Sequence, residues 1–205
     1  MNDRKELIRV LDNFCPMTEE VRQSALDSGF SNWNPKTSAM GRPQYEGMNF
    51  CGRHSYMMAA LVAAVKELIF PNTMFFRVTN SNTEEGYVHS DRHWGAHTCV
   101  VYLSDHPEVS GTAFYRNRAT GLMEMPTHQQ MLSPEFEQLK QDVQTGGENE
   151  WEQIDFVRGL YNRAVIFHAP LFHGRLPKHG IGESSEEGRM VWVCHFHTGA
   201  TLNQQ

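Results

Sequence analysis

The N-terminal part of the chain carries two patterns typical of helices. Within residues 1–30, apolar side chains recur with the i, i+3, i+4, i+7 spacing of one buried helical face: Leu7, Val10, Leu11 and Phe14. Gly, Pro and Asn then accumulate through residues 31–53, which predicts an irregular loop. Residues 54–70 are rich in Ala, Met and Leu and end before Pro71. They predict the strongest helix of the chain, apolar nearly all round and packed against a sheet.

Further along, short apolar and β-branched runs alternate with turn residues, which predicts strands. We expect these strands at residues 75–79, 87–91, 98–103, 111–115, 154–157, 163–167, 171–175 and 189–196. Residues 116–150 interrupt them, and Ser133-Pro134-Glu135 predicts the start of a short helix there. Helices followed by many short strands indicate an α+β, mainly β fold, a helix-backed β-sandwich or jelly roll. We expect one domain over residues 1–205, with residues 1–70 as helical support and residues 71–196 as the β core.

Composition narrows the class of protein. The chain has 205 residues, 40% of them apolar and 20% charged, as in a globular protein with a substantial core. Its net charge of −6, without a basic run, argues against a large nucleic-acid footprint. The N-terminus does not read as a signal peptide, and no apolar stretch approaches membrane-spanning length, so we expect a cytoplasmic protein without membrane contact. The four Cys form no C-x-x-C pair, whereas the 11 His favour a metal site.

The tripeptide His89-Ser90-Asp91 is the strongest candidate for chemistry. Residues at i and i+2 of a strand share a face, so one imidazole and one carboxylate can reach the same ion. A second His from a distant strand would complete a two-His-one-carboxylate triad, which suits Fe(II) and leaves positions open for oxygen chemistry. The candidates for that ligand lie in the second half of the chain: His168, His173, His179, His195 and His197.

An ordered set of motifs resembles the Fe(II)/2-oxoglutarate-dependent dioxygenases, especially their prolyl-4-hydroxylase-like branch. The similarity covers roughly residues 75–196 and consists of His89-Ser90-Asp91, Tyr102-Leu103-Ser104, Ser110-Gly111-Thr112-Ala113-Phe114, Asn162-Arg163-Ala164-Val165-Ile166-Phe167, His173 and Gly188-Arg189-Met190-Val191-Trp192. The fold that this resemblance implies is a double-stranded β-helix, a jelly roll. The implied activity is oxidation of a substrate, expected to be hydroxylation, coupled to conversion of 2-oxoglutarate into succinate and carbon dioxide.

The same resemblance implies a role for each site residue. His89, Asp91 and His173 would hold Fe(II). Arg189 would bind the distal carboxylate of 2-oxoglutarate, because a planar guanidinium pairs bidentately with a carboxylate. Tyr102 would donate a hydrogen bond to the same carboxylate. Ascorbate is a candidate reductant.

Some features leave alternatives open. Val191 stands where many family members have Ser or Thr, so Tyr102 or Thr98 would have to replace one hydrogen bond to the cosubstrate. The spacing from His173 to Arg189 is longer than common, so Arg175 is a rival carboxylate anchor. His195 shares a strand face with Arg189 by alternation and is the structural rival of His173. A non-catalytic, cupin-like protein that binds a metal or small molecule, and a zinc hydrolase, are the alternative functions.

The substrate is not readable from the sequence. Peptidyl proline, a free amino acid, another small metabolite and a nucleobase all fit the resemblance, and no oligomeric state is predicted. Residues 116–150 contain Gly121, Gly146 and Gly147 between two β segments. They are a candidate mobile flap over the metal.

Overall fold

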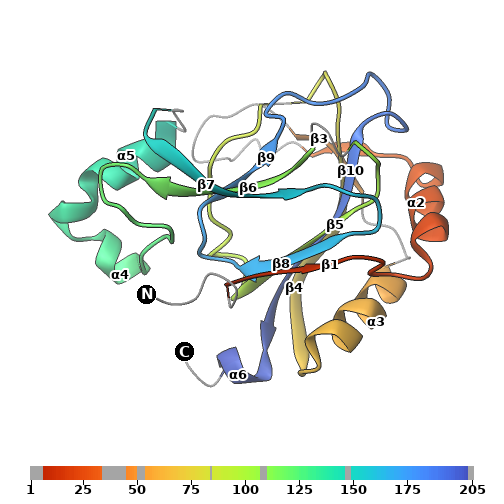
Figure 1. Cartoon of the computed structure of the whole chain (residues 1–205), viewed down its shortest axis with the longest axis horizontal. Helices are drawn as coiled ribbons and strands as arrows, with labels where there is room; N and C mark the ends of the chain where they lie inside the picture. Colours follow the sequence, from red (N-terminus) through yellow and green to blue (C-terminus); the bar gives the residue numbers. More distant parts are fainter. Residues whose placement is uncertain are drawn as a thin grey trace.

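The computed structural model describes residues 7–33, 45–49, 54–83, 85–106, 110–145 and 149–202. Its ten strands form two antiparallel sheets (Figure 1). The larger sheet is built, in spatial order, from β1 (Ile8–Leu11), β8 (Ala164–His168), β5 (His97–Tyr102), β10 (Arg189–Thr198), β4 (Ile69–Thr79), β3 (Tyr45–Asn49) and β2 (Ser31–Trp33). The smaller sheet is built from β7 (Trp151–Arg158), β6 (Gly111–Asn117) and β9 (His173–Leu176).

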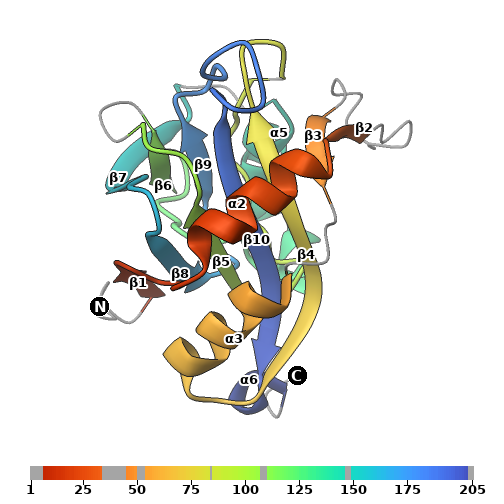
Figure 2. The ribbon, with the colours of Figure 1, turned by 90° about the vertical axis from the view of Figure 1, so that its right-hand side faces the viewer.

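Each face of the larger sheet buries a different set of side chains. Helices α2 (Thr18–Asp27) and α3 (His54–Val65) cover the outer face (Figure 2), where Val21 and Leu61 join the same buried cluster as Trp192. The inner face packs toward the smaller sheet, and Tyr102, Phe114 and other residues fill the space between them. Strand alternation produces this division, since successive residues point to opposite faces. The polar residues of the inner face are therefore the ones that can form an enclosed site.

The N-terminal segment differs from the helix predicted for it. Residues 8–11 form strand β1, not a helix, and Ile8 lies opposite Phe167 of β8. The apolar spacing fits a helix, but β8 offers a free edge whose hydrogen bonds decide the outcome, and the β-branched Ile8 and Val10 suit a strand. Helix α2 follows and ends near Gly29, whose φ of 69° is left-handed.

Two further boundaries differ from expectation. Helix α3 ends at Val65, Lys66 takes a left-handed φ of 61°, and β4 has begun by Ile69. Pro71 lies inside β4, which is tolerated because β3 pairs with β4 only at Phe76 and Arg77. Within the predicted loop, residues 31–33 form the edge strand β2 and residues 45–49 form its neighbour β3. Residues 34–44 and 50–53 of that predicted loop lie outside the described residues.

The insertion between β6 and β7 contains α4 (His128–Met131), a 3-10 turn at Pro134–Phe136 and α5 (Glu137–Thr145), so the helix predicted from Ser133 is confirmed. Figure 1 shows α4 and α5 on the side of the molecule opposite α2 and α3. Leu139 is fully buried, and the buried Asp142 accepts a 2.7 Å hydrogen bond from Asn117 at the end of β6. Helix α5 is therefore packed against the rest of the protein, and it gives no support to the hypothesis that residues 116–150 form a mobile flap. Within the described residues, no helix is both long enough and apolar enough to cross a bilayer.

Candidate metal centre

The backbone brings the two histidines of the predicted triad directly opposite each other. His89 and His173 form an isolated antiparallel bridge in which each N–H donates to the other's carbonyl at 2.9 Å. The predicted strand at residues 87–91 is reduced to this bridge. Opposed residues of such a pair project to the same side, and the two rings lie with centroids 4.4 Å apart.

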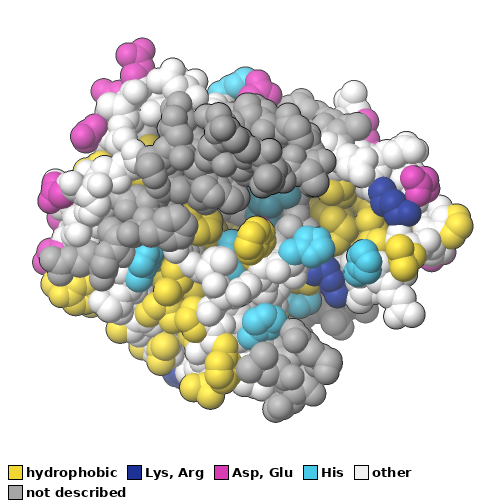
Figure 3. All heavy atoms as spheres, turned by 180° about the vertical axis from the view of Figure 1, so that it is seen from behind, with side chains coloured by type: hydrophobic (Ala, Val, Ile, Leu, Met, Phe, Trp, Pro, Cys, Tyr) yellow, Lys and Arg dark blue, Asp and Glu magenta, His cyan; other side chains and the backbone are white. Residues whose placement is uncertain are grey.

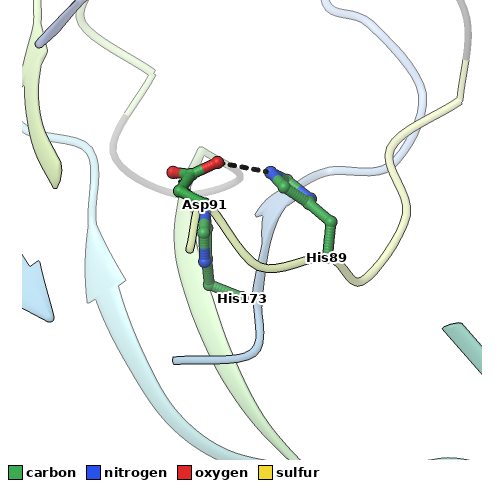
Figure 4. A group of neighbouring side chains, drawn as sticks. All are labelled: His89, Asp91 and His173. Atoms are coloured by element: carbon green, nitrogen blue, oxygen red, sulfur yellow. Dashed lines mark ion pairs between the residues drawn. The ribbon is translucent and has the colours of Figure 1, made fainter. Parts of the chain in front are cut away.

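Asp91 completes the group, as Figure 4 shows. Its Oδ1 lies 3.7 Å from His89 Nε2, and its Oδ2 lies 3.2 Å from His173 Nε2. One ligand atom from each of the three residues lies within 4.8 Å of the others. Atoms bound to one metal ion have separations of this size. The structure therefore brings together the three residues that the family resemblance implied.

Hydrogen bonds fix the tautomer of both rings. His89 Nδ1 lies 3.0 Å from the Tyr87 carbonyl, and His173 Nδ1 lies 2.8 Å from the Leu171 carbonyl. A carbonyl only accepts, so Nδ1 of each ring carries the hydrogen, and Nε2 is the nitrogen that faces Asp91. In a neutral ring this nitrogen carries a lone pair that can bind a metal ion. The arrangement is that of a metal site with its outer hydrogen bonds in place.

Electrostatics agree with this interpretation. Burial and the neighbouring His173 lower the pKa of His89 to about 4, so its ring is neutral near pH 7. Burial alone would raise the pKa of Asp91, but His173 and His195 hold it well below its usual value. The side chain of His89 is 37% exposed, whereas that of His173 is 7% exposed. The group therefore opens to solvent on the His89 side, and several histidine side chains lie close together on the face shown in Figure 3.

Arg189 lies buried on the inner face of β10 with no carboxylate partner among the described residues. Its Nε is buried without a hydrogen-bond partner, and its guanidinium carbon lies 5.4 Å from the centroid of the Tyr102 ring. Burial lowers the pKa of Arg189, which the Tyr102 side chain opposes. Burial of a cation is costly unless an anion pairs with it, so this position suits the carboxylate of a bound molecule.

Tyr102, whose ring lies beside the Arg189 guanidinium, also has a buried hydroxyl. This hydroxyl lies 2.7 Å from Thr112 Oγ1, and burial raises the pKa of Tyr102, so the hydroxyl keeps its hydrogen. The rival anchor Arg175 donates to the Lys178 carbonyl at 2.9 Å, whereas Arg189 donates to the Gly111 carbonyl at the longer distance of 3.4 Å. Ser81 donates to the Gly182 carbonyl and Gly86 to the Lys178 carbonyl, so the loop of residues 177–188 lies beside them and accounts for the long spacing between His173 and Arg189.

The remaining candidate ligands do not join the group within the described residues. His168 Nδ1 lies 3.0 Å from Glu124, and His179 is 79% exposed beside Glu85. His195 is different, because its Nε2 lies 3.2 Å from Asp91 Oδ2. Sequence alternation placed His195 on the inner face of β10 but could not show which group it meets there. Thr73 beside it carries no sequence signal of its own, and Thr98, a candidate donor to the cosubstrate, donates to Asp91 at 2.9 Å.

The chain matches one family model and resembles several solved structures. A family model described as "Family of unknown function (DUF6445)" matches residues 1–196. No curated protein matches the chain. Among solved structures, the non-heme alpha ketoglutarate dependent carbocyclase SnoK from nogalamycin biosynthesis is similar with a TM-score of 0.59 and 12% identity, covering 94% of this chain and 80% of that one.

Two further similar structures contain bound molecules. The epimerase SnoN in complex with Fe3+, alpha ketoglutarate and nogalamycin RO has a TM-score of 0.54 at 11% identity, covering 94% of this chain and 79% of SnoN. HygX from Streptomyces hygroscopicus with nickel, 2-oxoglutarate and hygromycin B bound has a TM-score of 0.53 at 13% identity, covering 94% of this chain and 83% of HygX. At such identities these similarities show a shared fold.

Proposed function

Since the chain belongs to DUF6445, a family of unknown function, its activity has to be inferred from the site, and we propose that it is an Fe(II)- and 2-oxoglutarate-dependent dioxygenase. The observation that carries this proposal is the pair of histidines whose Nδ1 atoms are held by carbonyls while both Nε2 atoms face Asp91. Two imidazoles and one carboxylate on one side of an ion are the typical ligand set of non-heme Fe(II) oxygenases.

Arg189 and Tyr102 supply the second part of the proposal. Arg189 is a buried cation that lacks an anionic partner among the described residues, and it would pair with the distal carboxylate of 2-oxoglutarate. Tyr102 would donate to the same carboxylate through its protonated hydroxyl. Val191 cannot donate, so Arg189 and Tyr102 would carry this contact without the Ser or Thr that many family members have at that position.

The neighbours support the chemistry at a coarse level. SnoN and HygX have alpha ketoglutarate or 2-oxoglutarate bound together with a metal, and the carbocyclase and epimerase among them show that one fold hosts several outcomes. We propose that the two sheets form the double-stranded β-helix of the Fe(II)/2-oxoglutarate-dependent dioxygenases. We also propose that the chain belongs to the prolyl-4-hydroxylase-like branch of these enzymes. Hydroxylation of a small-molecule or peptidyl substrate is the proposed reaction, with ascorbate as a reductant that sustains it.

The contributions of the chain's own residues follow from their positions. His89, Asp91 and His173 would hold Fe(II), which when bound supplies the oxygen chemistry. Arg189 and Tyr102 would orient 2-oxoglutarate by its distal end. The buried side chains around the site, such as Phe114 and Phe167, would exclude water from its inner side.

Succinate release tests the proposal. Purified protein with Fe(II), ascorbate and 2-oxoglutarate should release succinate even without its substrate, and candidate substrates should increase the rate. His173→Ala should abolish the Fe(II)-dependent release. His168→Ala is the matched control, because His168 bonds Glu124 outside the triad, and this variant should keep the release.

The outcomes also separate the alternatives. Metal binding without succinate release from the wild-type protein, with no substrate found in a library screen, would favour a cupin-like binding protein. Unchanged succinate release from His173→Ala would remove the basis of the site assignment.

A further inference from the structure

His195 contacts the metal-binding carboxylate without belonging to the triad. It projects from β10, is 5% exposed, and places Nε2 at 3.2 Å from Asp91 Oδ2. Its ligand atoms fall outside the set that lies within 4.8 Å among the described residues. The same Asp91 oxygen accepts a 2.9 Å hydrogen bond from Thr98 Oγ1. Two side chains from neighbouring strands therefore meet one carboxylate oxygen.

The hydrogen-bond partners of His195 give it a different tautomer from the two ligand histidines. Its Nδ1 lies within hydrogen-bond distance of the Thr73 hydroxyl, which can donate as well as accept. An ionised carboxylate only accepts, so Nε2 of His195 carries the hydrogen directed at Asp91. In His89 and His173 a backbone carbonyl requires the hydrogen on Nδ1 instead. His195 therefore donates to the metal-binding group.

Aromatic neighbours hold the His195 ring in this orientation. Trp94 stacks on it with centroids 6.0 Å apart and an interplanar angle of 25°, and the tilted Phe75 ring also lies at a centroid distance of 6.0 Å. The backbone N–H of Trp94 donates to the backbone carbonyl of Asp91 at 2.8 Å, which holds Trp94 beside the site. The ring is thus fixed by stacking, by Thr73 and by the carboxylate that it contacts.

We propose that His195 is a positioning residue that, together with Thr98, prevents the Asp91 carboxylate from rotating and so fixes how it meets the metal. The inference rests on the proposed metal centre. A carboxylate without these donors can rotate and offer both oxygens to the ion, which would change the coordination and weaken preorganisation. Partners of metal ligands typically change metal affinity by about 10- to 100-fold when removed.

Metal titration and the absorption spectrum of the Co(II) protein test this role without any turnover. Relative to wild type, His195→Phe keeps a planar ring but no donor, and it should bind Co(II) about 10- to 100-fold more weakly with an altered spectrum. His195→Gln places an amide N–H near the position of Nε2 and should restore most of the affinity and the wild-type spectrum. His168→Phe changes a histidine that does not touch Asp91 and should leave both unchanged.

The results distinguish this inference from the proposed function. If the wild-type protein binds Co(II) and His195→Phe matches it in affinity and spectrum, the positioning role is wrong while the metal centre stands. If His195→Gln is as impaired as His195→Phe although both fold, by circular dichroism, an N–H donor at this position does not restore the site and the inference also fails. A wild-type protein that binds no Co(II) would remove both.

Discussion

At the scale of single residues, the role of a histidine here depends on the partner of its second ring nitrogen. His89 and His173 meet backbone carbonyls through Nδ1 and are the proposed ligands, whereas His195 meets Thr73 and is the proposed donor. The sequence could place all three on inward faces by alternation. It could not predict these partners, because they depend on the register between segments far apart in the chain. The difference between ligand and donor therefore appears only in the structure.

The carboxylate anchor gives a prediction at the same scale. Arg189→Ala should weaken 2-oxoglutarate binding about 10- to 100-fold, because a charge-assisted contact of about 1.5–3 kcal/mol is lost. Metal binding should change little, since Arg189 contacts none of the three proposed ligands. Calorimetric titration of the anaerobic metal-loaded protein with 2-oxoglutarate measures both effects.

Arg175→Ala is the control for the anchor assignment. The Arg175 side chain donates to the Lys178 carbonyl and lies in β9, so its loss should leave 2-oxoglutarate binding nearly unchanged. A large loss in Arg175→Ala together with a small one in Arg189→Ala would reverse the assignment.

At the scale of elements, the β core was predictable and the N-terminal segment was not. Alternating apolar residues predicted the strands that carry Tyr102, Arg189 and His195, within a few residues of their observed ends. Strand β1 was missed because four residues carry too little periodicity to outweigh a helical spacing. Its position depends on an edge of β8 that exists only after the sheet has formed.

Asn162 fastens this N-terminal segment to the core. Its side-chain amide exchanges two hydrogen bonds of 2.9 Å with the backbone of Cys15, and its φ of 58° is left-handed. Asn162→Ala should therefore lower the free energy of unfolding by about 2–3 kcal/mol, from two lost bonds and a strained backbone. Chemical denaturation followed by circular dichroism measures this loss.

Asn162→Gly separates the two contributions. Glycine accepts the left-handed conformation but provides no amide, so its loss should be smaller than that of Asn162→Ala. Equal stability of wild type and Asn162→Ala would show that the Cys15 contact does not hold the segment.

At the scale of the whole molecule, two sheets enclose the site and two helices support the larger sheet from outside. The sequence predicted a mainly β fold because strand patterns fill most of residues 71–196, but β1, β2 and β3 lie within residues 1–70, which were expected to be helical support. It did not predict that the insertion helix α5 would be fixed by a buried Asp142, since a polar helix between Gly-containing segments also fits a mobile flap. The assignment of all 205 residues to one domain stays a prediction, as does a cytoplasmic location.

The most direct test of the central claim is a crystal structure of the protein grown anaerobically with Fe(II) and 2-oxoglutarate. We predict one iron ion bound by His89 Nε2, Asp91 and His173 Nε2, with 2-oxoglutarate bound to the same ion and its distal carboxylate paired with Arg189. Iron held by other residues, or a triad that binds metal while no 2-oxoglutarate carboxylate pairs with Arg189, would contradict the claim.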